Sequence, residues 1–244
     1  MKKTLSAIVI GALLISVSFI SCKKTSDAPD TSGNHVLNYY TGSLSGLGTH
    51  GGLPAGFAFA WPSNIKIVGY MTGGDPGSKS IFKLPKNLKN IPSSLSKGNY
   101  TEYGIGTYVN VYMKLYNTNN TPYQLIIPSG VIMCDSFPND TTVVDTSQSG
   151  IIIPPDTINI PGSDTVGVCL KSFCLNEHHA APSSLNKYKF AVITSNESLH
   201  TVVTILRNKK SLSAHISDIQ TILWKITDGQ GLSQADIDMM NSWN

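Results

Sequence analysis

Charged residues are scarce in this chain: only 14% of its 244 residues are Asp, Glu, Lys or Arg, and aromatic residues make up 8%. A disordered chain is richer in charge and poorer in apolar residues than this one, which is 41% hydrophobic, so the composition predicts a folded domain. No uncharged apolar run after residue 20 approaches the about 20 residues that a membrane-spanning helix needs. The formal net charge of +3 falls to about +1 when Lys2 and Lys3 are removed, which argues against nucleic acid as a partner.

The sequence also lacks the short motifs of several common enzyme classes. It contains neither the phosphate-binding Gly-x-x-x-x-Gly-Lys-Ser/Thr pattern nor the His-Glu-x-x-His pattern of zinc proteases. The nearest match to the Gly-x-Ser-x-Gly motif of serine hydrolases, at residues 42–46, has Leu44 at the nucleophile position. We therefore predict a protein that is not an enzyme, with no cofactor and no bound metal.

The first residues have the layout of a secretory signal peptide. Lys2 and Lys3 precede an uncharged run at residues 5–20, and the small residue Ser21 stands before Cys22. The Phe-Ile-Ser-Cys tetrad that ends at Cys22 resembles the lipobox of bacterial lipoproteins, with Phe in place of the usual Leu. That resemblance, of the kind found in Bacteroidota lipoproteins, implies a diacylglyceryl thioether on Cys22 as the new N-terminus. Ordinary secretory cleavage that leaves Cys22 as a thiol is the alternative.

These observations divide the N-terminal part into a lipoprotein signal peptide, residues 1–21, and a lipidated cysteine with a flexible tether, residues 22–34. Each buried CH₂ of an acyl chain contributes about 0.8 kcal/mol, and one chain anchors only marginally, so two or three chains on Cys22 would hold the protein on a membrane. The tether is polar and rich in turn-forming residues. We expect a lipid-anchored protein of the cell envelope, at the outer membrane or cell surface.

Three cysteines remain after Cys22, and an odd number in an oxidising compartment leaves one bridge and a spare thiol, or three thiols. Cys134 and Cys169 both lie in runs typical of strands, so we predict a disulfide between them, which leaves Cys174 as the spare. The pair Cys169 and Cys174 would be about 16 Å apart on a continuous strand, because a strand rises about 3.3 Å per residue, and would need a bend to form a bridge.

Short runs of β-favouring residues alternate with turn-forming clusters from residue 36 onward. Alternating apolar positions at residues 109–115 are typical of a strand with one buried face. Repeated runs of this kind predict antiparallel sheets packed face to face, and the polar turn at residues 117–121 is common in immunoglobulin-like sandwiches. The predicted fold is mainly β, an antiparallel immunoglobulin-like β-sandwich over residues 35–195. Its loops at residues 42–56 and 117–121 are the predicted contact surfaces.

The pattern becomes helical after residue 195. Apolar residues recur at helical spacing in residues 199–206 and again in residues 216–226. Asp228 and Gly229 predict a stop for the second helix, and the segment from Ser233 to Asp236 is a capping box that begins a third, which ends near Trp243. We predict a helical lobe at residues 196–244, packed on the sandwich.

Two motifs in the last third resemble those of bacterial thioester adhesin domains. The Phe-Cys-Leu-Asn sequence at residues 173–176 is similar to their aromatic-Cys-apolar-polar motif, and Ile-Gln-Thr-Ile-Leu-Trp at residues 219–224 is similar to their Thr-Gln-x-Ala-Ile-Trp helix. The resemblance implies a β-rich domain with a helical part, in which Cys174 and Gln220 form an internal thioester that acylates an amine on a host surface. The alternative is structural: Cys174 is a buried strand residue, while Gln220 and Trp224 pack their helix on the sheet.

A third hypothesis rests on the neighbouring histidines His178 and His179. Together with distant histidines they would form the centre of a zinc-dependent envelope enzyme; the sequence offers His35, His50, His200 and His215 as further ligands. Our leading expectation is a non-enzymatic envelope lipoprotein with a binding or adhesion role towards a surface protein or glycan. The covalent adhesin and the zinc enzyme are the two alternatives.

Overall fold

The computed structural model describes residues 36–37, 44–74, 100–135 and 147–244. Contacts between residues group positions 34–244 into one compact unit, distinct from residues 1–33. The predicted signal peptide, the lipid site at Cys22 and the tether lie outside the described residues.

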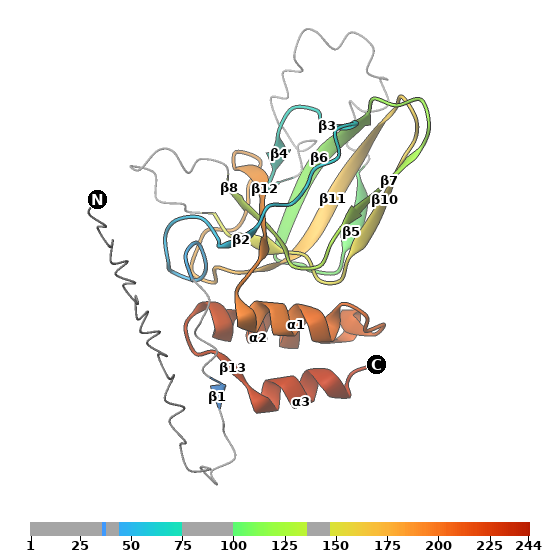
Figure 1. Ribbon diagram of the computed structural model, residues 1–244. Helices are drawn as coiled ribbons and strands as arrows, with labels where there is room; N and C mark the ends of the chain where they lie inside the picture. Colours follow the sequence, from blue (N-terminus) through green and yellow to red (C-terminus); the bar gives the residue numbers. More distant parts are fainter. Residues whose placement is uncertain (1–35, 38–43, 75–99, 136–146) are drawn as a thin grey trace, which may run out of the picture. The chain divides into compact units, whose positions relative to one another are not determined.

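Apart from the short strand β13, which lies between α2 and α3, the strands come first along the chain and the helices last (Figure 1). The elements, in order, are β1 (Val36–Leu37), β2 (Gly56–Phe57), β3 (Ile65–Ile67), β4 (Met71–Thr72), β5 (Thr101–Gly104), β6 (Val109–Asn117), β7 (Tyr123–Ile127), β8 (Val131–Asp135), β9 (Gly150–Ile151), β10 (Asp156–Ile160), β11 (Thr165–Cys174), β12 (Lys187–Thr194), α1 (Glu197–Leu206), the 3₁₀ helix η3 (Leu212–His215), α2 (Ile216–Thr227), β13 (Leu232–Ser233) and α3 (Gln234–Ser242). The fold is therefore mainly β with a helical C-terminal part, as predicted.

The long strand β6 follows its sequence pattern closely. Val109, Val111, Met113 and Leu115 are buried, and the residues between them are half-buried, because successive side chains of a strand point to opposite faces. β11 runs antiparallel to β6 with Val168 opposite Met113, and this is the longest ladder of the domain. These two strands form the frame on which the candidate site is built.

Six strands close on themselves, which differs from the predicted immunoglobulin-like sandwich. The pairings run from β6 through β4, β12, β8, β9 and β11 and return to β6, so the sheet forms a closed barrel. β3, β2 and β5 pair with β6, β12 and β11 outside this ring, and β7 and β10 form a separate antiparallel ladder. The prediction rested on alternation and turns, which are the same in a sandwich and in a closed sheet; the closing pairs join strands far apart in sequence.

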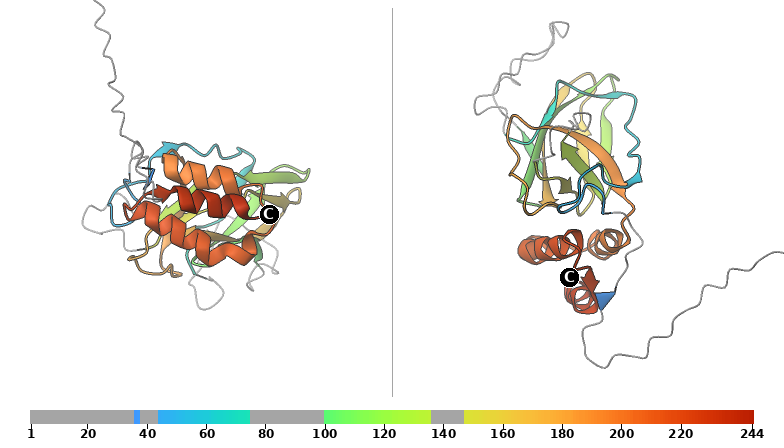
Figure 2. Two further views of the ribbon diagram at one scale, coloured as in Figure 1. Left: turned by 90° about the horizontal axis from the view of Figure 1, so that it is seen from below. Right: turned by 90° about the vertical axis from the view of Figure 1, so that its left-hand side faces the viewer.

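The three predicted helices are confirmed and lie at one end of the barrel (Figure 2). Asn196 caps α1, its side chain accepting a hydrogen bond from the backbone N–H of Leu199. Ser233 and Asp236 form the predicted capping box of α3. α1 and α2 pack next to the barrel and α3 packs on them from the far side, which gives the chain a helical layer beneath its strands.

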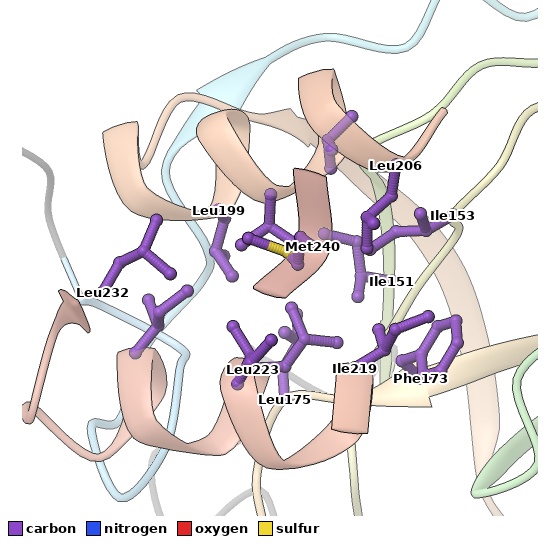
Figure 3. Packing of buried hydrophobic residues seen from close by; sticks show 14 of the residues in the cluster. Ile151, Ile153, Phe173, Leu175, Leu199, Leu206, Ile219, Leu223, Leu232 and Met240 are labelled. Carbon is purple, nitrogen blue, oxygen red and sulfur yellow. The ribbon is translucent and has the colours of Figure 1, made fainter. Parts of the chain in front are cut away.

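Two apolar clusters share strand β11. One fills the barrel, and the other joins the helices to the barrel's end and includes Phe173, Leu175, Leu199 and Leu223 (Figure 3). Because side chains of a strand alternate, Phe173 and Leu175 face the helical cluster, whereas Cys174 between them belongs to the barrel cluster. The end of β11 thus lies at the junction of the two cores.

Candidate functional site

The predicted pair Cys174 and Gln220 comes together in the structure. The Cys174 backbone N–H donates to Gln220 Oε1 at 2.9 Å, and Gln220 Nε2 donates to the Cys174 carbonyl oxygen at 2.7 Å. Cys174 is 0% exposed and Gln220 is 1% exposed. A strand cysteine and a helix glutamine, 46 positions apart in sequence, therefore meet out of contact with solvent.

The position of Gln220 follows from where strand β6 begins. β6 pairs with β11 only as far as Val109, which lies opposite Ser172. The backbone N–H and carbonyl oxygen of Cys174, two residues further along β11, therefore have no strand beside them on that side. The carboxamide of Gln220 carries one donor and one acceptor, as a peptide group does, and it takes the place of the absent strand. The arrangement satisfies two buried backbone groups that would otherwise have no protein partner.

Asn176 shapes the other side of the cysteine. Its backbone N–H donates to the Cys174 sulfur at 3.3 Å, and its side chain donates to the Gly48 carbonyl at 2.9 Å and accepts from the Ser149 N–H at 3.0 Å. Gly48 has φ +57°, and a Cβ there would lie 2.1 Å from the Thr227 carbonyl oxygen, so only glycine fits at this position. Asn176 thereby ties the end of β11 to the loop before β2 and to the segment before β9.

Trp224 lies one turn after Gln220 on α2. Its ring packs edge-on against Tyr108, with ring centroids 5.4 Å apart, and it also packs against the apolar cluster inside the barrel. Its indole N–H forms no hydrogen bond of ordinary geometry, but it lies near enough to the Cys174 sulfur to favour the thiolate. The aromatic residue of the second motif thus covers the cysteine.

The surroundings keep the Cys174 thiol protonated at neutral pH. Burial is the largest effect and raises its pKa; the Asn176 hydrogen bond and the nearby Trp224 indole N–H lower it, and the negative charges of Glu177 and Asp228 raise it. The net direction is upward from the ordinary thiol value of 9.0. Any reaction of this sulfur therefore has to pass its proton to another group.

The other histidines do not gather around His178 and His179. His178 lies with Glu177 and Asp228, whereas His179 is outside that group and its Nδ1 is buried without a hydrogen-bond partner. The remaining histidines that the structure describes are dispersed: the ring of His215 stacks on Trp243, His50 contacts the Leu47 carbonyl oxygen, and His200 is on α1; His35 lies outside the described residues. Sequence reasoning missed Asp228, which it interpreted only as a helix stop.

The predicted disulfide between Cys134 and Cys169 is absent, and Cys134, Cys169 and Cys174 are all buried thiols. The strand register explains why. Gly150 on β9 pairs with Met133 of β8 on one side and with Cys174 of β11 on the other, so Met133 and Cys174 lie at the same level of the barrel. Cys134 is therefore level with Leu175, which is six residues beyond Cys169. That offset is about 20 Å along the strands, whereas a disulfide needs Cα atoms within about 7 Å.

The two predicted contact loops each contain a buried residue. Within the described part of the first loop, Leu47 is buried and the backbone N–H of Gly48 donates to the Leu175 carbonyl oxygen. In the second loop Asn117 is buried, and its side chain donates to the Thr121 carbonyl oxygen and accepts from the Asn119 N–H. Both loops also carry exposed residues, among them Gly51 and Asn119, and their role as contact surfaces stays a prediction.

Comparison with known proteins gives no family assignment. No family model matches this sequence, and neither the curated proteins nor the solved structures provided a match. Among the residues that the structure describes, no helix is both long and apolar enough to cross a membrane.

Proposed function

We propose that this chain is a cell-envelope lipoprotein with an adhesion role, and that Cys174 and Gln220 form an internal thioester that captures amines. The pair of reciprocal hydrogen bonds between the two residues, inside a buried site, is the observation that carries the proposal. The lipobox-like tetrad that ends at Cys22 supports the envelope location, since a lipid anchor would hold the domain at a membrane surface.

The hydrogen bonds suit the chemistry of thioester formation. In this step the Cys174 sulfur attacks the Gln220 side-chain carbonyl carbon, the bond from that carbon to Nε2 breaks, the thiol proton passes to Nε2, and ammonia leaves. Negative charge develops on Oε1 during the attack, and the Cys174 N–H that already donates to this oxygen stabilises it. Burial excludes water, which would hydrolyse the product.

The thioester would then react with an amine of a partner. An amine nitrogen attacks the thioester carbonyl, an amide bond to Gln220 forms, and the Cys174 thiol is released with a proton from the amine. The high pKa of this thiol means that it leaves in protonated form at neutral pH. The protein would thereby become covalently attached to a surface that displays amines.

Intact mass spectrometry of the purified chain tests this proposal. We expect a mass about 17 Da below that of the sequence, because ammonia is lost, and an increase of about 31 Da on treatment with methylamine. Cys174→Ala and Gln220→Ala should each restore the full mass, whereas the control Cys169→Ala, in the same strand, should keep the deficit. A full mass with an alkylatable Cys174 in the native chain would contradict the thioester.

The membrane anchor has a separate test. Cys22→Ala should move the protein from the membrane fraction to the soluble envelope fraction, because acyl chains on Cys22 supply the attachment. Cys134→Ala is a matched control that should leave the distribution unchanged. Retention of Cys22→Ala in the membrane fraction would overturn the lipoprotein assignment without bearing on the thioester.

Non-covalent binding is the second candidate, favoured by an aromatic groove of about 410 Å³ away from Cys174. Phe59, Trp61 and Phe190 form mutual ring contacts along it, and Tyr70 is 59% exposed at its side. This candidate predicts glycan binding that Cys174→Ala preserves and Tyr70→Ala weakens, as measured on a glycan array. Unaltered binding by Tyr70→Ala would remove the groove from consideration.

A further inference from the structure

Two carboxylates and an imidazole meet where the loop after β11 contacts the end of α2. Glu177 and His178 follow Cys174 by three and four residues, and Asp228 is the C-cap residue of α2. One ligand atom from each of these three side chains lies within 4.8 Å of the others. The sequence separates Asp228 from the other two by about fifty residues, so only the packing of α2 on β11 brings them together.

A second, independent observation is that one carboxylate oxygen of Asp228 lacks a partner. Its Oδ1 is buried and has no hydrogen-bond partner, although buried carboxylate oxygens are ordinarily paired. The helix end does not use this carboxylate, because the cap is made by the Asp228 backbone N–H, which donates to the carbonyl oxygens of Trp224 and Ile226. A bound cation would supply the partner that this oxygen lacks.

We propose that Glu177, His178 and Asp228 bind one divalent transition-metal cation, with Zn²⁺ as the best fit. An imidazole nitrogen with two carboxylate oxygens is a donor set that Zn²⁺ accepts, and two negative charges balance the cation. Ca²⁺ and Mg²⁺ prefer oxygen donors alone, which disfavours them here. Three protein ligands leave the fourth tetrahedral position for water or an exchangeable ligand.

The distances suit closure around an ion. Ligand bonds of about 2.1 Å place the donors of a tetrahedral site about 3.4 Å apart, so the three ligand atoms, which lie within 4.8 Å of one another, have to approach by at most about 1.4 Å. Glu177 and His178 are exposed and have room to move, while Asp228 is held at the end of its helix. The loop side chains would therefore close on a fixed carboxylate.

This site would clamp the two elements that carry Cys174 and Gln220. Glu177 and His178 belong to the chain that continues from β11, and Asp228 ends the helix that bears Gln220, so an ion here joins strand and helix. A cation that binds only this folded arrangement stabilises it. The inference does not depend on whether a thioester forms.

Titration of the untagged full chain with Zn²⁺ tests the site. We expect one ion per chain with a Kd on the order of 10 µM or tighter, and no comparable binding of Ca²⁺ or Mg²⁺. Differential scanning calorimetry should show a Tm increase of about 5 °C or more when free Zn²⁺ is about 100 times its Kd. Absence of stoichiometric binding would overturn the proposal.

Variants assign the ligands. Glu177→Gln, His178→Ala and Asp228→Asn should each weaken Zn²⁺ binding at least about tenfold. Asp228→Asn is nearly isosteric at a side chain that forms no hydrogen bond through Oδ1, and its Tm without metal reports that it is folded. The matched controls His179→Ala and His200→Ala should bind as the native chain does. Loss of binding in a control, or native binding in all three ligand variants, would place the ion elsewhere and contradict the assignment.

Discussion

Gln220 closes a gap in the hydrogen bonding of the barrel. Its carboxamide pairs with both backbone groups of Cys174 beyond the end of β6, in a site from which solvent is excluded. Without this side chain a buried N–H and a buried carbonyl oxygen would lose their partners, and each such loss costs about 1–3 kcal/mol. The residue therefore has a structural role whether or not it also reacts with the thiol.

Gln220→Met keeps the length of the side chain and removes both hydrogen bonds. We expect the free energy of unfolding to fall by about 2–5 kcal/mol, measured by urea denaturation in a Cys174→Ala background that cannot form a thioester. The control Gln234→Met changes an exposed glutamine and should have a small effect. A loss below about 1 kcal/mol for Gln220→Met would show that other groups satisfy the Cys174 backbone.

Helix α3 is joined to α2 by one buried carboxylate. Asp236 completes the capping box with Ser233 and forms an ion pair with Lys225 of α2, with 2.8 Å between Nζ and Oδ1. Burial alone would raise the pKa of Asp236, but the hydrogen bonds and charge of Lys225 and the hydrogen bonds of Ser233 outweigh it and lower the pKa. Asp236 thus stabilises the folded protein in its ionised form.

The direction of this pKa shift predicts an acid-sensitive contact. A lowered pKa in the folded state contributes stability above the ordinary value of 3.8, and that stability is lost as the pH falls through the folded-state value. The native chain should therefore lose more stability on acidification than Asp236→Asn does, as followed by Tm at a series of pH values. Asp238→Asn, at an exposed position of the same helix, is the control and should follow the native profile. Parallel profiles for native and Asp236→Asn would refute this role.

At the scale of the whole molecule, strands and helices share a core. Ile151, Phe173 and Leu175 come from strands or their ends, yet their side chains belong to the cluster filled by α1, α2 and α3 (Figure 3). Burial of one such side chain contributes about 1.5–3 kcal/mol. The helices therefore complete the barrel and do not form an independent lobe.

Removal of the helices should prevent folding of the barrel. A chain that ends at Ser195 would expose the apolar end of the barrel, and we expect aggregation or loss of near-UV circular dichroism. A chain that begins at Asn34 is the matched control, because residues 1–33 belong to a separate unit, and it should keep the native signal. A soluble, cooperatively unfolding fragment without the helices would show that the two parts are separable.

Local patterns in the sequence account for the elements. Alternating apolar residues predicted β6, helical spacing predicted α1 and α2, and the capping box at Ser233 predicted the start of α3, because each depends on residues a few positions apart. The motif resemblance also selected Cys174 and Gln220 as partners, which the structure places in contact. The lipid site at Cys22 remains a prediction, because it lies outside the described residues.

The closure of the barrel, the strand register and the meeting of Asp228 with Glu177 were decided only by the tertiary structure. A single sequence shows which face of a strand is apolar, but not which distant strand it pairs with, and both a sandwich and a closed barrel satisfy the same alternation. The absent Cys134–Cys169 bridge has the same cause, since register along the strands, not strand membership, sets the distance between two cysteines. Sequence periodicity specified the local elements, and long-range pairing placed the side chains that form the site.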